Sequence, residues 1–158
     1  MKFYVPCVPP KSTSQMKKIV RFKDKAGNQK TSLVPNAKSA AAKRFLYSMF
    51  LEHSPEVAFV GPVRLSIAFV WPWRVSEPKK NRQKGFIFND KRPDADNLAK
   101  ISIDALMDAA FFSRDDSQVA CLSVVKGWGD RNGIYVAIDE LVDDAVRDIL
   151  FDHNENYK

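Results

Sequence analysis

The most regular hydrophobic pattern in the chain lies in residues 63–70, where apolar side chains occupy every second position. Strict alternation of this kind predicts a strand with one buried face. Shorter apolar runs bounded by turn residues predict further strands over residues 2–8, 119–125 and 134–138. Residues 128–133 contain two glycines, an aspartate and an asparagine, which predicts that the last two strands form a hairpin.

Two segments have helical character instead. Residues 36–53 follow a proline, contain an alanine-rich stretch, and place apolar residues three and four positions apart. Residues 95–109 predict a second helix, and residues 140–151 predict a third. With the strands, these helices predict one α+β domain over residues 1–158, in which a mixed β-sheet is packed by two or three helices.

A basic segment separates the first strand from the first helix. Residues 11–35 are poor in large apolar side chains, and the turn residues Ala26-Gly27-Asn28 divide them. Residues 19–22 and 29–34 can therefore pair as a hairpin. Because so little apolar surface anchors it, we expect a mobile basic arm over residues 11–35 that orders on a partner.

Charge is distributed unevenly along the chain, whose net charge is +6. Residues 1–51 hold eleven Lys or Arg and one acidic residue, whereas residues 139–158 hold seven acidic and two basic residues. The first 138 residues thus carry 23 basic against 12 acidic residues, with an acidic helix or tail after them. A basic body points to a polyanion such as nucleic acid, although a merely solubilising surface gives the same composition.

Several classes of protein are excluded. No apolar run approaches the ~18 residues that span a bilayer, so we expect no membrane association. The N-terminus lacks a signal-peptide pattern, which favours a cytoplasmic location. Two histidines give almost no material for a histidine zinc site or a Ser-His-Asp triad, and two cysteines in apolar contexts give no disulfide framework.

Candidate chemistry is concentrated in residues 94–116. Asp94 and Asp96 fall at the predicted start of a helix, where backbone N–H groups favour carboxylates. Lys100 and Asp104 follow at intervals of four residues and share one helix face with Asp96. Asp115-Asp116 precede the next strand and could complete a site at the helix start.

Aspartates without histidine favour Mg²⁺, which takes oxygen ligands, waters and a substrate phosphate. A lysine beside such an ion could neutralise a phosphate oxygen during phosphoryl displacement. The same residues could instead be helix caps, a turn and a solvated charge ladder. An EF-hand is excluded, because Leu98, Ala99 and Ala105 occupy positions that require a ligand, a glycine and a glutamate.

The ordered segment Pro93-Asp94-x-Asp96-Asn97-Leu98-x-Lys100, followed by Asp104-Ala105-Leu106 and Asp115-Asp116-x-Gln118-Val119, resembles the signature of RusA-type Holliday junction resolvases. The resemblance implies a RusA-like fold and a small homodimeric endonuclease. It also implies dependence on Mg²⁺, with Mn²⁺ as a possible substitute, and symmetric cutting of four-way DNA junctions.

The resemblance also assigns roles to individual residues. Asp94 and Asp96 match the paired metal-ligand aspartates, Asp116 matches the third ligand, and Lys100 matches a lysine that assists catalysis. Asp104 and Asp115 are supporting positions. The segment between Lys100 and Asp116 is one residue longer than expected, which leaves the choice between Asp115 and Asp116 open.

Basic residues around the motif are candidate phosphate contacts. They are Lys17, Lys18, Arg21, Lys79, Lys80, Arg82, Lys84, Lys91 and Arg92. Two main hypotheses follow: a metal-dependent endonuclease selective for branched DNA, or a protein that binds branched DNA such as forks and flaps without the predicted catalysis or selectivity. A phosphatase is a weaker third, because the basic surface is much wider than one phosphate.

Overall fold

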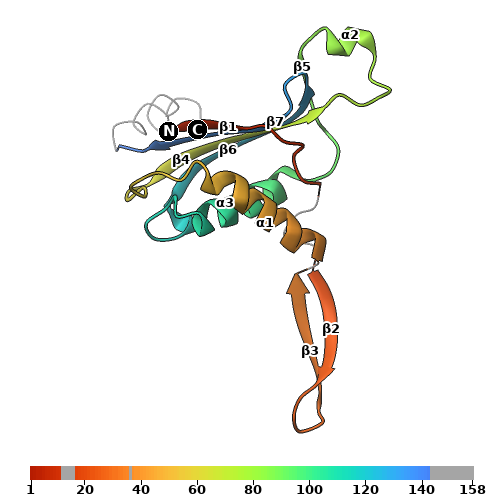
Figure 1. Cartoon of the computed structure of the whole chain (residues 1–158), viewed down its shortest axis with the longest axis vertical. Helices are drawn as coiled ribbons and strands as arrows, with labels where there is room; N and C mark the ends of the chain where they lie inside the picture. Colours follow the sequence, from red (N-terminus) through yellow and green to blue (C-terminus); the bar gives the residue numbers. More distant parts are fainter. Residues whose placement is uncertain (12–16, 36, 143–158) are drawn as a thin grey trace, which may run out of the picture.

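The computed structural model of the chain describes residues 1–11, 17–35 and 37–142 (Figure 1). Its centre is a five-stranded sheet in the order β1 (Lys2–Val5), β7 (Gly133–Glu140), β4 (Val63–Pro72), β6 (Val119–Gly129) and β5 (Phe86–Phe88). The β4–β6 pair is parallel, and the other neighbouring pairs are antiparallel. The predicted mixed sheet is therefore confirmed.

Two long helices, α1 (Ala37–Leu51) and α3 (Ala95–Asp108), lie side by side on one face of this sheet (Figure 1). The alternation along β4 explains why, because the buried side chains Leu65, Ile67 and Phe69 all point toward the helices. Leu46 of α1 and Leu106 of α3 are fully buried against them. The α+β domain and its two main helices match the prediction, while the third helix in the structure, α2 (Lys79–Arg82), is a single turn within a basic loop.

The predicted hairpin between the last two strands is wrong. β6 and β7 are joined by only three residues, yet β4 lies between them and pairs with both. The connection crosses the end of β4, where the side chain of Asn132 donates a 2.8 Å hydrogen bond to the carbonyl of Cys7. Turn residues specify a reversal of direction, but the burial of the ten-residue apolar β4 decides which strand lies alongside.

Strand ends differ from the predictions for local reasons. β1 stops at Val5 rather than residue 8, because Pro6 has no N–H to donate to the sheet. β6 continues to Gly129, since its far edge pairs with β5. Asp139 and Glu140 belong to β7, so the acidic segment predicted from residue 139 begins inside the sheet. The predicted terminal helix lies, from residue 143 onward, outside the described residues.

The basic arm contains the predicted hairpin, formed by β2 (Lys17–Lys23) and β3 (Gln29–Pro35), which projects away from the sheet (Figure 1). Its turn is closed by the carboxylate of Asp24, which accepts hydrogen bonds from the N–H groups of Ala26 and Asn28 at 2.9 and 3.0 Å. The hydrogen bond from the Asn28 backbone is the main cause that lowers the pKa of Asp24. Gly27 has a φ of 84°, a conformation that favours glycine.

Candidate active site

The N-terminus of α3 presents two exposed carboxylates. Asp94 is the N-cap residue, and its carbonyl accepts the first helical hydrogen bond, from the N–H of Leu98 at 3.1 Å. Asp96 lies in the first turn, where the helix dipole favours a negative charge. The opposite side of the helix packs Leu98 and Ile101 into the core, so burial of the apolar face turns both carboxylates outward.

Lys100 connects this helix to the segment before β6. Its ammonium group lies 3.1 Å from a carboxylate oxygen of Asp104 on the same helix and 3.1 Å from one of Asp116. The hydrogen bond to Asp104, followed by that to Asp116, raises the pKa of Lys100, so the lysine remains a cation. The structure thus brings Lys100, Asp104 and Asp116 together.

The two neighbouring aspartates have different surroundings. Asp115 caps the short 3₁₀ helix η1 (Asp116–Gln118), and its carboxylate accepts hydrogen bonds from the N–H of Ser117, at 2.9 Å, and from the Ser117 hydroxyl. The hydroxyl contact is the main cause that lowers the pKa of Asp115. Asp116 instead faces α3 through Lys100. Of the two aspartates, Asp116 is therefore the one whose carboxylate contacts α3.

Gln118, which sequence reasoning treated only as part of a motif, anchors this segment. Its side chain is 2 % exposed. The amide nitrogen donates 2.9 Å hydrogen bonds to the carbonyls of Phe59 and Gly61, and the amide oxygen accepts one from the N–H of Arg114 at 2.7 Å. Gln118 therefore fixes the position of the turn that carries Asp116.

Lys126 of β6 was missed by sequence reasoning. Its ammonium group donates hydrogen bonds to the carbonyls of Lys91, at 2.9 Å, and Pro93, at 2.7 Å. These contacts tie the residues just before Asp94 to the sheet. The available signal was a single lysine directly after the apolar pair Val124-Val125 at the end of a predicted strand.

The candidate metal ligands are carboxylate oxygens, with no histidine or cysteine among them, and this type of ligand suits a hard cation. Among the residues that the structure describes, however, no three His, Cys, Asp or Glu side chains are grouped closely enough to hold one ion. Asp116 is paired with Lys100, whereas the carboxylate of Asp94 accepts a 3.4 Å hydrogen bond from the side chain of Asn97. Mg²⁺ commonly binds through one or two carboxylates and completes its shell with water and substrate phosphate.

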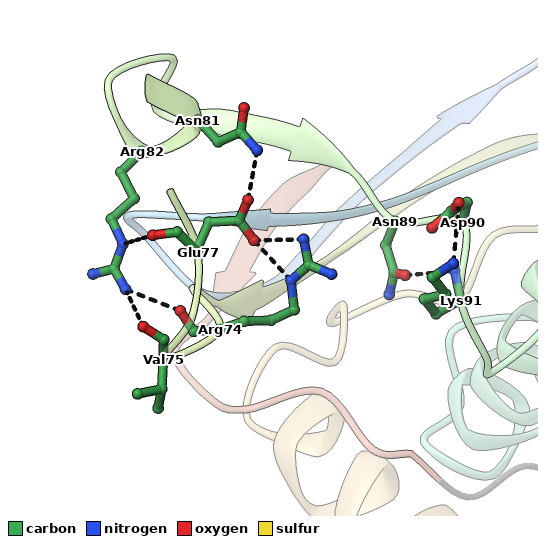
Figure 2. Close-up of polar contacts among 8 residues, drawn as sticks. All are labelled: Arg74, Val75, Glu77, Asn81, Arg82, Asn89, Asp90 and Lys91. Atoms are coloured by element: carbon green, nitrogen blue, oxygen red, sulfur yellow. Dashed lines mark hydrogen bonds and ion pairs between the residues drawn. The ribbon is translucent and has the colours of Figure 1, made fainter. Parts of the chain in front are cut away.

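A basic loop between β4 and β5 is organised by a buried carboxylate (Figure 2). The side chain of Glu77 is fully covered. It accepts hydrogen bonds from Asn81 at 2.6 Å and from Arg74 at 2.7 Å, and these contacts, that of Asn81 first, lower its pKa. The guanidinium group of Arg82 donates to the carbonyls of Arg74, Val75 and Glu77.

This arrangement divides the predicted DNA-binding residues. Arg82 holds the loop together, while Lys79, Lys80 and Lys84 extend into solvent from the same loop. Other exposed cations of the predicted set are Arg21, Lys91 and Arg92, with Lys91 3.5 Å from Asp90. The strand positions of Lys17 and Lys18 are described, but their side chains lie outside the described set.

We expect Glu77→Gln to loosen this loop, because an amide keeps the size of the side chain but loses the charge that Arg74 pairs with. The folded pKa of Glu77 lies below its unfolded value, so the carboxylate stabilises the loop above the unfolded pKa, and this contribution is lost as the pH falls through the folded pKa. Hydrogen exchange of residues 74–85 at pH 7 should therefore be faster in the variant. Exchange that is equally fast in Glu56→Gln, a control outside the loop, would contradict this assignment.

Sequence comparison agrees with this geometry. The family model for endodeoxyribonuclease RusA matches residues 8–139, which include both long helices, the carboxylate segment and the strands of the sheet other than β1 and the last residue of β7. The chain thus belongs to the RusA family of endodeoxyribonucleases, hydrolases that act on junction DNA. It is also 32 % identical over 119 residues to the uncharacterized protein YqaN of Bacillus subtilis (strain 168), an alignment that covers 72 % of this chain and 82 % of that protein. None of the described helices is long and apolar enough to cross a membrane.

Proposed function

We propose that this protein is a cytoplasmic, Mg²⁺-dependent endonuclease that acts as a homodimer and resolves four-way DNA junctions by paired phosphodiester hydrolysis. The observation that carries the proposal is the contact between α3 and the Asp116 turn through Lys100, which lies about one helical turn after Asp96. Membership of the RusA family supplies the reaction class. Two-fold symmetry of a dimer would match a junction with two equivalent cleavage positions.

In this proposal Asp94, Asp96 and Asp116 would hold the metal, and Lys100 would contact a phosphate oxygen of the substrate. When bound, the ion would supply an activated water and neutralise charge on the leaving oxygen. Asp104 contacts the Lys100 ammonium from the same helix and so keeps it beside the site. Mn²⁺ is an expected substitute, since it accepts the same oxygen ligands.

DNA is held by exposed cations of the predicted set. Lys79, Lys80 and Lys84 form one exposed group on the loop braced by Glu77, and Lys91 and Arg92 lie next to the helix mouth. Arg21 on the projecting hairpin could reach DNA further from the cleavage site. Phosphate contacts of this kind fix the orientation of the duplex without reading its sequence.

The function is tested by incubating the purified protein with a four-way junction, a fork, a flap and a linear duplex, with Mg²⁺ and with EDTA. Paired nicks in the junction that require Mg²⁺, together with weak cutting of the duplex, are the expected result. Tight binding to branched DNA without cleavage in either Mg²⁺ or Mn²⁺ would overturn the catalytic proposal and favour a binding protein.

The basic loop has its own expected result. Replacing Lys79 and Lys80 with alanine should reduce the slope of log affinity against log salt by about two, because each phosphate contact contributes roughly 0.9 to that slope. The slope is measured by fluorescence anisotropy with a labelled junction, at salt concentrations between about 50 and 200 mM. Lys2→Ala, which removes an exposed lysine on β1, is the control and should leave the slope unchanged.

A further inference from the structure

An exposed aromatic ring lies on β5, the edge strand that runs from the basic loop to Asn89 (Figure 2). The middle residue of this strand, Ile87, packs against the core, so its neighbours Phe86 and Phe88 point to the other face of the strand. Phe88 is 77 % exposed. Single apolar side chains are common on protein surfaces, so the surroundings of Phe88 decide whether it has a role.

The ring of Phe88 stands on a seat built from Phe86 and Gly127. A Cβ atom on residue 127 would overlap the Phe86 ring, so the glycine lets that ring lie against the backbone of β6. Phe88 pairs with Gly127 in the β5–β6 ladder, and its ring meets the Phe86 ring at an interplanar angle of 85°, with the centroids 5.3 Å apart. Phe86 thus supports Phe88 from one side, while most of the Phe88 ring faces solvent.

The backbone that follows Phe88 is also held in place. Asn89 is buried, and its N–H donates a 2.9 Å hydrogen bond to the carbonyl of Lys126. Its side-chain oxygen accepts a 2.8 Å hydrogen bond from the N–H of Lys91. An aromatic side chain on a backbone that is already ordered loses little conformational entropy when a ligand covers it.

Phe88 lies close to the candidate active site. Lys126, the neighbour of Gly127 on β6, donates a 2.7 Å hydrogen bond to the carbonyl of Pro93, directly before Asp94. Phe88 is six residues before Asp94, so the two are separated by at most about 20 Å of extended chain. This distance corresponds to about six nucleotides of one DNA strand.

Exposed cations occur on both sides of β5. They are Lys84 before the strand and Lys91 and Arg92 after it. A basic surface that contacts phosphates, with an aromatic ring on which a base can stack, is the combination that binds unpaired nucleotides. The charge around Phe88 therefore favours nucleic acid as the partner that covers its ring.

We propose that Phe88 stacks on a base that is unstacked at the branch point of the DNA, and that this contact makes the protein prefer branched to linear DNA. The inference rests on the proposed action on branched DNA, but not on the cleavage reaction. Exposing a base from a continuous duplex costs more free energy than doing so where pairing and stacking are already interrupted. Since every base has a π-face, Phe88 selects the structure of the DNA rather than its sequence.

Equilibrium binding in EDTA, measured with a labelled four-way junction and with a linear duplex of equal length, tests the ring without cleavage. Phe88→Ala should weaken junction binding by about tenfold or more, the loss expected for one stacked base, and duplex binding by less than about twofold. Phe88→Leu should lose as much, because it remains apolar but has no π-face, and Phe88→Trp should restore junction binding. Val57→Ala is the matched control, since Val57 is 79 % exposed in the loop between α1 and β4, and it should change neither affinity.

A second measurement follows the base itself. 2-Aminopurine, placed in turn at each position beside the branch point, becomes more fluorescent when it leaves the stack of bases. The unsubstituted protein should raise the fluorescence at one or more of these positions in EDTA. Phe88→Ala should abolish that rise at DNA concentrations that saturate the protein.

Three results would overturn the inference. The first is an equal preference for the junction in Phe88→Ala and in the unsubstituted protein. The second is full junction affinity in Phe88→Leu, which would show an apolar contact without stacking. The third is a change in oligomeric state in Phe88→Ala, measured by sedimentation velocity without DNA, which would assign the ring to contact with a second copy.

Failure of the proposed reaction gives a different result. If the unsubstituted protein does not cut the junction in Mg²⁺ but Phe88→Ala loses junction affinity, the proposed reaction is wrong and the stacking role stands. If the protein cuts the junction and Phe88→Ala binds and cuts with the same preference, only the stacking role is wrong.

Discussion

Asp96→Asn should reduce Mg²⁺-dependent cleavage of a four-way junction by about 10³-fold or more, which corresponds to roughly 4 kcal/mol of lost transition-state stabilisation. The amide has the same size and remains exposed at the first turn of α3, so the fold should not change. It cannot supply the charge that we propose for holding the metal. Single-turnover cleavage of a labelled junction, with Mg²⁺ in excess, measures the effect.

Junction affinity separates this loss from a general defect. With a negative charge removed from a site that faces phosphate, binding should survive or become tighter. Asp90→Asn is the matched control, because Asp90 is also exposed and only four residues before Asp94. We expect the control to cut at the unsubstituted rate. Cleavage by Asp96→Asn at that same rate would show that the metal site has been assigned to the wrong residues.

Gln118→Met should destabilise the protein by about 3 kcal/mol, because it leaves buried backbone groups without partners. The amide group contacts the carbonyls of Phe59 and Gly61 and the N–H of Arg114, and methionine fills a similar volume without replacing these hydrogen bonds. For a domain of this size the melting temperature should fall by about 10 °C, which thermal denaturation followed by circular dichroism can measure.

The same substitution should weaken cleavage under conditions where the variant remains folded. Asp116 and Gln118 belong to the same short helix, η1, so the buried side chain of Gln118 holds the turn that carries Asp116 in place. Without that anchor the turn is loose, and the Asp116 carboxylate is misplaced relative to Lys100. Gln83→Met, at an exposed position after α2, removes an amide without a buried partner and should change neither property. An unchanged melting temperature in Gln118→Met would show that these hydrogen bonds do not hold the segment in solution.

The separation of Asp115 from Asp116 illustrates what tertiary structure adds to a motif. Both are aspartates before a strand, and the spacing alone left open which of them reaches α3. In the structure Ser117 engages Asp115 within the turn, while Asp116 lies 3.1 Å from the ammonium of Lys100. Local hydrogen bonding occupies one carboxylate and leaves the other for the long-range contact.

The basic loop shows the same dependence. Its charge was visible from the sequence, which predicted phosphate contacts for Lys79, Lys80, Arg82 and Lys84. Only the packed structure shows that Arg82 serves the carbonyls of its own loop while Lys79 and Lys80 remain exposed. Glu77, the buried carboxylate that organises the loop, carried no pattern that distinguished it from a surface residue.

From the sequence alone, the periodicity of β4 and of the two long helices, the hairpin of the basic arm, and the order of the carboxylates and Lys100 could all be predicted. These features depend on residues close together in the chain, where side-chain alternation and helical spacing act directly. The tertiary structure decided that β4 separates β6 from β7, that Gln118 and Lys126 anchor the segments beside the carboxylates, and that Lys100 pairs with Asp116. Those contacts join residues distant in sequence, and burial of the shared core, rather than any local pattern, brings them together.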